Sequence, residues 1–168
     1  MLSKYILGIL VCFFLTLTGC SNNMSDSAEN AAKPPRIINE VGVLSKLISL
    51  PKRPKSVRWL EPDPNNKESA ELLALIEFSE ADYAEIVKNS PPFDLVRDEK
   101  MPEAIFNEWI PAAIATMIET KQENGIVAMK GINALKPDLF TQAKASPFIH
   151  GTITPLGSGF IFIYLYTM

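Results

Sequence analysis

The chain has 168 residues, of which 47% are apolar and 21% are charged, a balance typical of one globular domain with a hydrophobic core. It carries 19 acidic against 16 basic side chains, whereas nucleic-acid binding selects a basic excess or a basic stripe, so we expect no nucleic-acid partner. The basic run "PKRPKSVR" at 51–58 is interrupted by prolines and is interpreted as a solvated lead-in to a strand. A contact with an anionic partner or with lipid headgroups is the alternative for this run.

The first 19 residues have the parts of a secretory leader. The amino terminus and Lys4 supply positive charge, and "YILGILVCFFLTL" at 5–17 is an uncharged apolar core. A helix that spans a bilayer needs about 20 such residues, so this core is too short to cross and has the length found in signal peptides. Residues 1–19 are therefore predicted to be a leader that is removed.

The leader ends in a large aliphatic residue, two small residues and a cysteine, Leu17-Thr18-Gly19-Cys20. This pattern resembles the lipobox of bacterial lipoproteins. The resemblance implies that signal peptidase II recognises Leu17, Thr18 and Gly19 and cuts before Cys20. It also implies a diacylglyceryl group on the Cys20 thiol and an acylated new amino terminus. A plain signal anchor followed by a free cysteine is the alternative.

The resemblance also implies a location. The residue after the cysteine is Ser21, not the aspartate associated with retention at the inner membrane. We therefore expect an outer-membrane protein that faces the periplasm, with the inner membrane and the cell surface as alternatives. Each buried methylene of an acyl chain contributes about 0.8 kcal/mol, and stable anchoring takes more than one chain.

Cleavage of the leader changes the number of cysteines and of charged side chains in the mature protein. The chain has two cysteines, and Cys12 lies inside the leader, so only Cys20 remains after cleavage. This excludes a disulfide within the mature domain and a cysteine metal cluster. The leader contains one basic residue, Lys4, and no acid, which leaves 15 basic against 19 acidic side chains.

The segment after the cysteine is polar and nearly free of large apolar residues, "SNNMSDSAENAAKPP" at 21–35. Such a sequence buries too little surface to fold by itself, so residues 20–35 are predicted to be a lipidated cysteine with a flexible tether. The tether reaches roughly 50 Å when fully extended and spans about 20 Å as a random coil. Residues 36–168 are then a single globular domain.

The first half of this domain shows helical and strand periodicity in turn. Apolar residues at helical spacing predict a helix over 37–48, interrupted by Gly42. Alternation predicts strands over 56–61 and 71–78, and the turn-rich residues 61–68 join them into a hairpin with a long loop. Ser79 followed by Asp82 approximates a capping box, which predicts a helix that ends at Pro91-Pro92.

The second half contains one clear helical stripe and a carboxy-terminal hairpin. Residues 102–117 are predicted to be helical, with a break or kink at Pro111. Residues 124–140 are ambiguous between short helices and a strand. Strands are predicted over 147–154 and 160–168, joined by a turn at 155–159. The ββ-helices-ββ order predicts an α+β domain with an antiparallel sheet of about four strands and helices packed on one face.

Aromatic side chains follow one face of the last predicted strand, and they are a candidate interaction surface because tyrosine is favoured at interfaces. The four residues are Phe160, Phe162, Tyr164 and Tyr166. Alternatively, this stripe packs beneath the helices beside Trp59 and Trp109. Glu77 shares a strand face with Leu73 and Leu75, so we expect this face of the first hairpin to meet water or a partner.

The sequence offers little catalytic chemistry. His150 is the only histidine, and it is interpreted as a structural residue at a sheet margin, with a site residue as the alternative. A Ser–His–Asp arrangement would combine it with Ser146 or Ser158, but no nucleophile motif surrounds either serine. One histidine without a free cysteine is the wrong ligand set for zinc. The stretch "EPDPNN" at 61–66 lacks the glycine and the closing glutamate of a calcium loop.

Because no glycine-rich phosphate loop occurs either, we expect no catalytic residue, no metal and no cofactor. The expected function is that of a lipid-anchored envelope lipoprotein, tied to the membrane through Cys20, whose domain binds a protein or envelope component without catalysing a reaction. An immunity or inhibitor protein is one form of this function. The alternative is a small periplasmic hydrolase that uses His150 with a carboxylate.

Overall fold

The computed structural model describes residues 36–62, 70–94, 98–144 and 146–167, and all of them belong to one compact unit, Pro34–Met168. The helices are α1 (Val41–Leu47), α2 (Glu80–Asn89), α3 (Glu103–Trp109) and α4 (Ala112–Ala115). The strands are β1 (Ile37–Ile38), β2 (Ser56–Leu60), β3 (Glu71–Glu77), β4 (Glu99–Pro102), β5 (Thr120–Glu123), β6 (Ile126–Met129), β7 (His150–Gly157) and β8 (Phe160–Tyr166).

The main sheet has five antiparallel strands in the order β1-β2-β3-β8-β7. Both predicted hairpins lie in it as neighbouring strand pairs, β2 with β3 and β7 with β8. The longest register joins β3 to β8, from Glu71 opposite Tyr166 to Glu77 opposite Phe160. The first and last parts of the domain therefore meet at the centre of one sheet.

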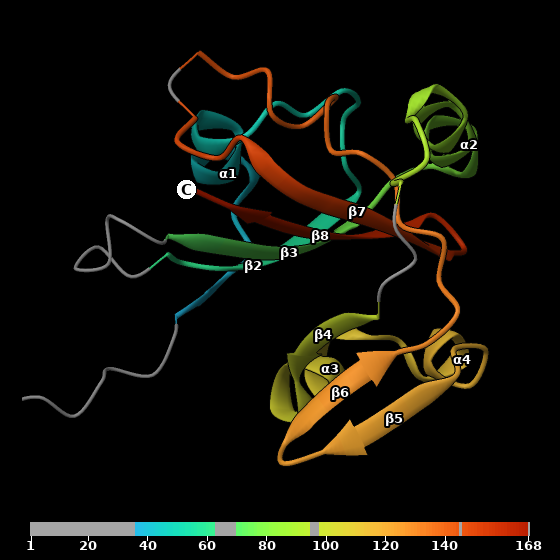
Figure 1. The fold of residues 1–168 in the computed structure, drawn as a ribbon. Coiled ribbons are helices and arrows are strands. Elements are labelled where there is room, and N and C mark those ends of the chain that lie inside the picture. Colours follow the sequence, from blue (N-terminus) through green and yellow to red (C-terminus); the bar gives the residue numbers. More distant parts are fainter. Residues whose placement is uncertain (1–35, 63–69, 95–97, 145, 168) are drawn as a thin grey trace, which may run out of the picture. The chain divides into compact units, whose positions relative to one another are not determined.

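One face of the main sheet packs against α1 and α2, which Figure 1 shows above the sheet. Alternate residues of β3, Leu72, Ala74 and Ile76, point to this face, as the period of two along a strand requires. They form a core cluster with Leu44 of α1 and Ile86 of α2. Each of these five side chains is at most 1% exposed, so this layer supplies a fully buried core.

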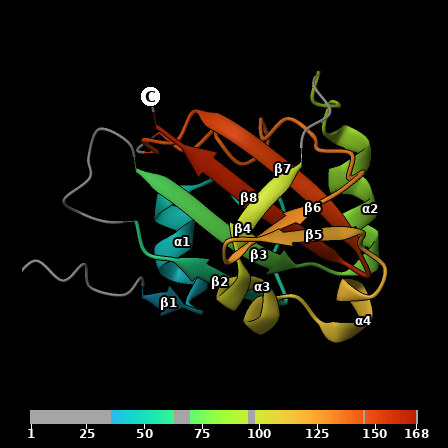
Figure 2. The same cartoon turned by 60° about the horizontal axis from the view of Figure 1, so that its bottom comes forward.

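The opposite face of the main sheet is covered by a second layer, in which α3 and α4 accompany a three-stranded sheet of order β4-β6-β5. Figure 2 shows this layer in front of the main sheet. Leu75 and Phe162 of the main sheet pack there against Trp109 of α3 and against Met101 and Met129 of the small sheet. A strand buried on both faces explains why β8 reads as a continuous apolar run.

The predicted fold class is confirmed, because the domain is α+β with an antiparallel main sheet. The structure adds two features to that expectation. The main sheet has five strands rather than about four, and helices cover both of its faces rather than one.

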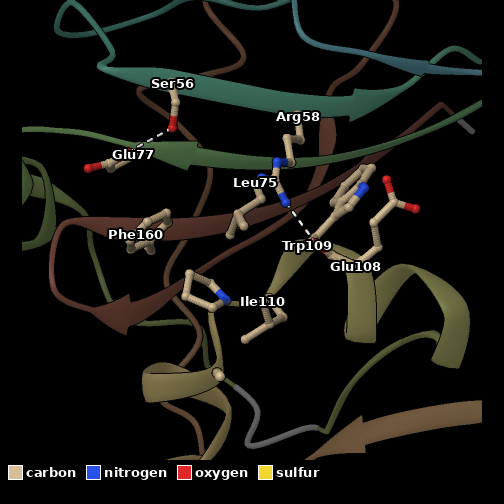
Figure 3. A pocket seen from close by; sticks show the side chains of 10 residues that line it. Ser56, Arg58, Leu75, Glu77, Glu108, Trp109, Ile110 and Phe160 are labelled. Carbon is tan, nitrogen blue, oxygen red and sulfur yellow. Dashed lines mark hydrogen bonds between the residues drawn. The ribbon is translucent and has the colours of Figure 1, made fainter.

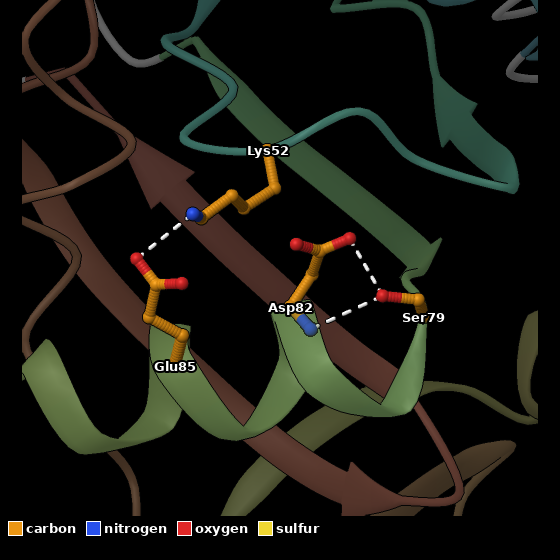
Figure 4. Close-up of polar contacts among 4 residues, drawn as sticks. All are labelled: Lys52, Ser79, Asp82 and Glu85. Carbon is orange, nitrogen blue, oxygen red and sulfur yellow. Dashed lines mark hydrogen bonds and ion pairs between the residues drawn. The ribbon is translucent and has the colours of Figure 1, made fainter.

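Helix α2 begins where its capping residues predict. The Oγ of Ser79 accepts a hydrogen bond from the Asp82 backbone N–H at 3.1 Å, and it donates to the Asp82 carboxylate at 2.6 Å (Figure 4). Glu85 of α2 also forms an ion pair of 2.8 Å with Lys52, which lies in the segment between α1 and β2. The hydrogen bond to Glu85 raises the pKa of Lys52 above its ordinary value of 10.5.

The predicted break at Pro111 is also confirmed. Helix α3 ends at Trp109, and α4 begins at Ala112 directly after the proline. Pro111 has no backbone N–H to continue the hydrogen-bond ladder of α3, so a second short helix starts instead.

Other boundaries differ from the predictions. The helix expected over 37–48 is confined to Val41–Leu47, because Ile37 and Ile38 pair with Trp59 and Leu60 as strand β1. Only β6 is regular within 124–140, and β4 and β5 were not predicted as strands. Strand β7 runs on through Pro155 to Gly157, so the turn predicted over 155–159 is confined to Ser158 and Gly159. The joining residues 63–69 lie outside the described part.

Within the described ranges, none of the helices has the length and apolar character needed to span a bilayer.

Candidate functional site

The structure brings His150 next to two of the candidate tyrosines. His150 opens β7 and pairs in register with Tyr166 at the end of β8. The ring centroids of His150 and Tyr166 are 5.6 Å apart, and those of Tyr166 and Tyr164 are also 5.6 Å apart. All three side chains are half-buried. We call these three residues the aromatic row.

A carboxylate lies beside the aromatic row. The Tyr164 hydroxyl donates a hydrogen bond of 2.8 Å to Oε1 of Glu71, which is exposed at the start of β3. Glu71 is also the register partner of Tyr166. The row therefore combines three aromatic rings with one acidic group, a combination suited to binding a partner that has both apolar and polar groups.

The other two residues of the predicted aromatic stripe have different surroundings. Phe162 is fully buried in the second core cluster with Trp109, and Phe160 is half-buried at a pocket described below. Trp59 belongs to the cluster on the opposite face of the sheet, so the stripe does not pack beside both tryptophans. The second layer thus covers the middle of the stripe and leaves its tyrosine end partly accessible.

Among the described residues, His150 forms no hydrogen bond with Ser146 or Ser158. The imidazole ring contacts the Tyr166 ring. Ser146 bonds locally to the Phe148 backbone, at 3.2 Å to the carbonyl and 3.1 Å from the N–H. Ser158 lies in the tight β7–β8 turn with φ of 49°.

A pocket of about 380 Å³ lies between the main sheet and the junction of α3 with α4 (Figure 3). Polar and apolar groups contribute about equally to its lining. The lining residues are Ser56, Arg58, Leu75, Glu77, Glu108, Trp109, Ile110, Pro111, Ala112 and Phe160.

Two hydrogen bonds organise the polar rim. The Ser56 hydroxyl donates to Oε2 of Glu77 at 2.8 Å, and Nη1 of Arg58 donates to the Glu108 carbonyl at 2.7 Å. The first bond joins β2 to β3, and the second joins β2 to the end of α3. The second layer covers Leu75 on the strand face that was expected to meet water or a partner, and Glu77 on the same face lines this pocket. Arg58 ends the basic run 51–58, for which contact with an anionic partner was the alternative, but nothing in that run predicted a pocket. Only the docking of α3 brings Arg58 over an apolar floor.

The lipidation site lies outside the described residues, as do the recognition residues Leu17, Thr18 and Gly19 and the tether from Cys20. Across 36–62, 70–94, 98–144 and 146–167, no group of three or more histidine, cysteine, aspartate or glutamate side chains has a geometry that could hold a metal ion.

Comparisons of this chain with protein-family models, with curated proteins and with solved structures found no significant match.

Proposed function

We propose that this protein is an envelope lipoprotein, anchored by lipid on Cys20 at the periplasmic side of the outer membrane, whose domain binds a protein or envelope component. In this proposal the domain performs recognition rather than catalysis. An immunity or inhibitor protein that captures an envelope-directed toxin is one form that such recognition would take.

The anchoring part of the proposal rests on the leader and its end. A charged start, an apolar core too short to span a bilayer, and Leu17-Thr18-Gly19-Cys20 follow one another in the order of a lipoprotein leader. A polar segment of 15 residues then separates Cys20 from the domain. This length holds the domain within roughly 50 Å of the membrane, so its partner must also act there.

The recognition part of the proposal rests on one structural observation, the aromatic row. His150, Tyr164 and Tyr166 form consecutive ring contacts at one end of the main sheet, and none of them is fully buried. Tyrosine contributes large contact area and a hydrogen-bonding hydroxyl with few rotatable bonds, so it binds partners at low entropic cost.

A photo-crosslinking experiment tests both parts. The photoreactive amino acid p-benzoylphenylalanine replaces Tyr166 in the full-length protein in living cells, and irradiation should give a discrete adduct with one partner. The same substitution at Glu119, an exposed position of the second layer, is the matched control and should give no such adduct.

Two further variants make the outcome decisive. Cys20→Ala should remove the adduct because the domain no longer resides at the membrane, and Tyr164→Ala combined with the probe at position 166 should weaken it at least tenfold. Adducts of equal yield from positions 166 and 119 would contradict a recognition role for the aromatic row.

A further inference from the structure

We propose that the pocket between the main sheet and the α3–α4 junction binds an apolar molecule that carries a single carboxylate, with Arg58 as the carboxylate-binding residue. A free aromatic or aliphatic acid and the last residue of a peptide share this chemistry. The site is separate from the aromatic row, so the inference does not depend on the function proposed above.

The size and lining of the pocket fit a small amphiphile. Its volume of about 380 Å³ is in the range of ligand pockets, in which apolar surface buries the ligand and polar groups orient it. Leu75, Trp109 and Ile110 are each at most 5% exposed and give the pocket a firm apolar base. Phe160 is half-buried and offers a ring to the cavity, so an aromatic or branched aliphatic group would bury its surface here.

Arg58 is the rim group placed to receive an anion. Its guanidinium points inward over Leu75 toward the end of α3, as Figure 3 shows, and one of its nitrogens is held by the Glu108 carbonyl. That bond fixes the group but uses only one of its five N–H donors. Among the described residues, no carboxylate forms an ion pair with Arg58. A guanidinium fork binds a carboxylate through two parallel hydrogen bonds, which is the strong geometry for this pairing.

The two glutamates of the rim set the charge that the site accepts. Figure 3 shows the Glu77 and Glu108 carboxylates pointing outward on opposite sides of the pocket, away from the guanidinium. A single negative charge on the ligand pairs with the Arg58 guanidinium, whereas the Glu77 and Glu108 carboxylates repel each further negative charge. The rim therefore favours a monocarboxylate over a phosphate or a dicarboxylate.

The two tryptophans of the chain provide an internal reporter and its control. Trp109 lines the pocket, and its indole N–H is buried without a hydrogen-bond partner among the described residues. Trp59 lies in the core cluster on the other face of the sheet, where its indole N–H donates to the Glu40 carbonyl at 3.3 Å. Occupation of the pocket should therefore perturb the signal of Trp109 and leave that of Trp59 in place.

The test is an NMR titration of the ¹⁵N-labelled full-length protein, followed at the two indole signals. We expect N-acetyl-L-phenylalanine and 3-phenylpropionate to shift the Trp109 signal saturably. Tighter binding of N-acetyl-L-phenylalanine would identify the carboxy terminus of a peptide as the ligand, and tighter binding of 3-phenylpropionate would identify a free acid. The neutral N-acetyl-L-phenylalanine amide and the dianion phenyl phosphate should each bind at least tenfold more weakly.

Arg58→Gln should abolish the preference for the acid over its amide. Lys100→Gln, which removes an exposed cation from β4, is the matched control and should leave the preference unchanged. The inference is overturned if acid and amide bind equally, if phenyl phosphate binds more tightly than the acids, if Trp59 shifts as much as Trp109, or if Arg58→Gln keeps the preference. Unchanged positions of the remaining backbone signals in Arg58→Gln would show that this variant is folded.

Discussion

Gly151 shows how strongly one residue of this fold is fixed by sterics. Its φ of +139° lies in a region that only glycine adopts readily. A Cβ atom here would overlap the carbonyl oxygen of Tyr164 and approach Leu165 Cα to 2.8 Å. Both neighbours are backbone atoms of β8, so they have little freedom to move. The close β7–β8 approach that aligns His150 with Tyr166 therefore depends on this glycine.

We expect Gly151→Ala to lower the free energy of unfolding by about 3 kcal/mol or more, since it combines backbone strain with a steric overlap. Gly125→Ala is the control, because Gly125 also has positive φ but has nothing within 4 Å of an added Cβ. That variant should cost only about 1 kcal/mol. Urea unfolding of both variants measures the difference, and equal losses would rule out the steric explanation.

The partly buried hydroxyl of Tyr83 links the stability of the domain to alkaline pH. Its hydroxyl accepts a hydrogen bond of 3.1 Å from the Gly157 N–H, and this bond ties α2 to the β7–β8 turn. The pKa of Tyr83 is raised above its ordinary value of 10.0, mainly because the hydroxyl is partly buried. Both folded and unfolded chains keep this proton below pH 10. Above pH 10 the unfolded chain loses it first, so stability falls as the pH rises toward the folded pKa.

Unfolding free energies measured between pH 8 and pH 11.5 should therefore fall more steeply for the wild type than for Tyr83→Phe. At pH 8 the variant should be less stable by about 1 kcal/mol, because the Gly157 N–H loses its acceptor. The Lys52–Glu85 pair also weakens at alkaline pH as Lys52 loses its proton, but this loss is common to both proteins and cancels in the difference. Parallel curves above pH 10 would refute the role given to Tyr83.

At the scale of elements, a buried polar contact helps to hold the two sheets together. Thr152 of β7 donates a hydrogen bond of 2.7 Å to the carboxylate of Glu99 in β4, and both residues are at most 2% exposed. A buried carboxylate is costly to leave under-bonded, so this contact contributes more than a surface hydrogen bond would. It specifies where β4 docks on the main sheet.

Thr152→Val keeps the shape of the side chain and removes the donor. We expect it to lower the free energy of unfolding by about 2 kcal/mol, the range for hydrogen bonds to charged groups. Hydrogen exchange should speed up in β4 and β6 more than in β3. Thr116→Ala, which removes an exposed hydroxyl bonded to the Ala113 carbonyl, is the control and should change stability little. Equal acceleration in every strand would mean that the contact does not dock the second layer specifically.

At the scale of the whole molecule, we propose that a lipid anchor ties the folded domain to the membrane. The lipobox resemblance predicts that the mature protein begins at Cys20 and carries a diacylglyceryl group on its sulfur. Mass spectrometry of the protein extracted from membranes should show the corresponding mass, with the leader absent. Cys20→Ala should retain the leader and lack the lipid mass, whereas Ser21→Ala should mature normally. An unmodified thiol at position 20 of the wild-type protein would contradict the prediction.

Capping residues, prolines and strand periodicity predicted the elements that short segments of the chain specify. The Ser79 cap, the Pro111 break and the two hairpins are fixed by neighbouring residues, and all four are found in the structure. Strand β4 was missed because it is paired with β6 across 24 or more residues, and β5 shows no apolar pattern because it is fully exposed. The β5–β6 hairpin does have a local signal, the Asn124-Gly125 turn, which was overlooked. Residues 37–38 share the apolar spacing of the following helix, but pairing with β2 makes them a strand.

By itself, therefore, the sequence determined the fold class, the two hairpins and the Ser79 cap, because hydrogen bonding and periodicity along short segments decide them. The leader and its lipobox remain predictions from the sequence. Only the tertiary structure decided which side chains of one strand face are covered. The docking of the second layer buries Phe162, leaves Tyr164 and Tyr166 partly accessible beside His150, and brings Arg58 over the apolar pocket. Arg58 and the Glu108 carbonyl that holds it are 50 positions apart along the chain, and no local pattern encodes their contact.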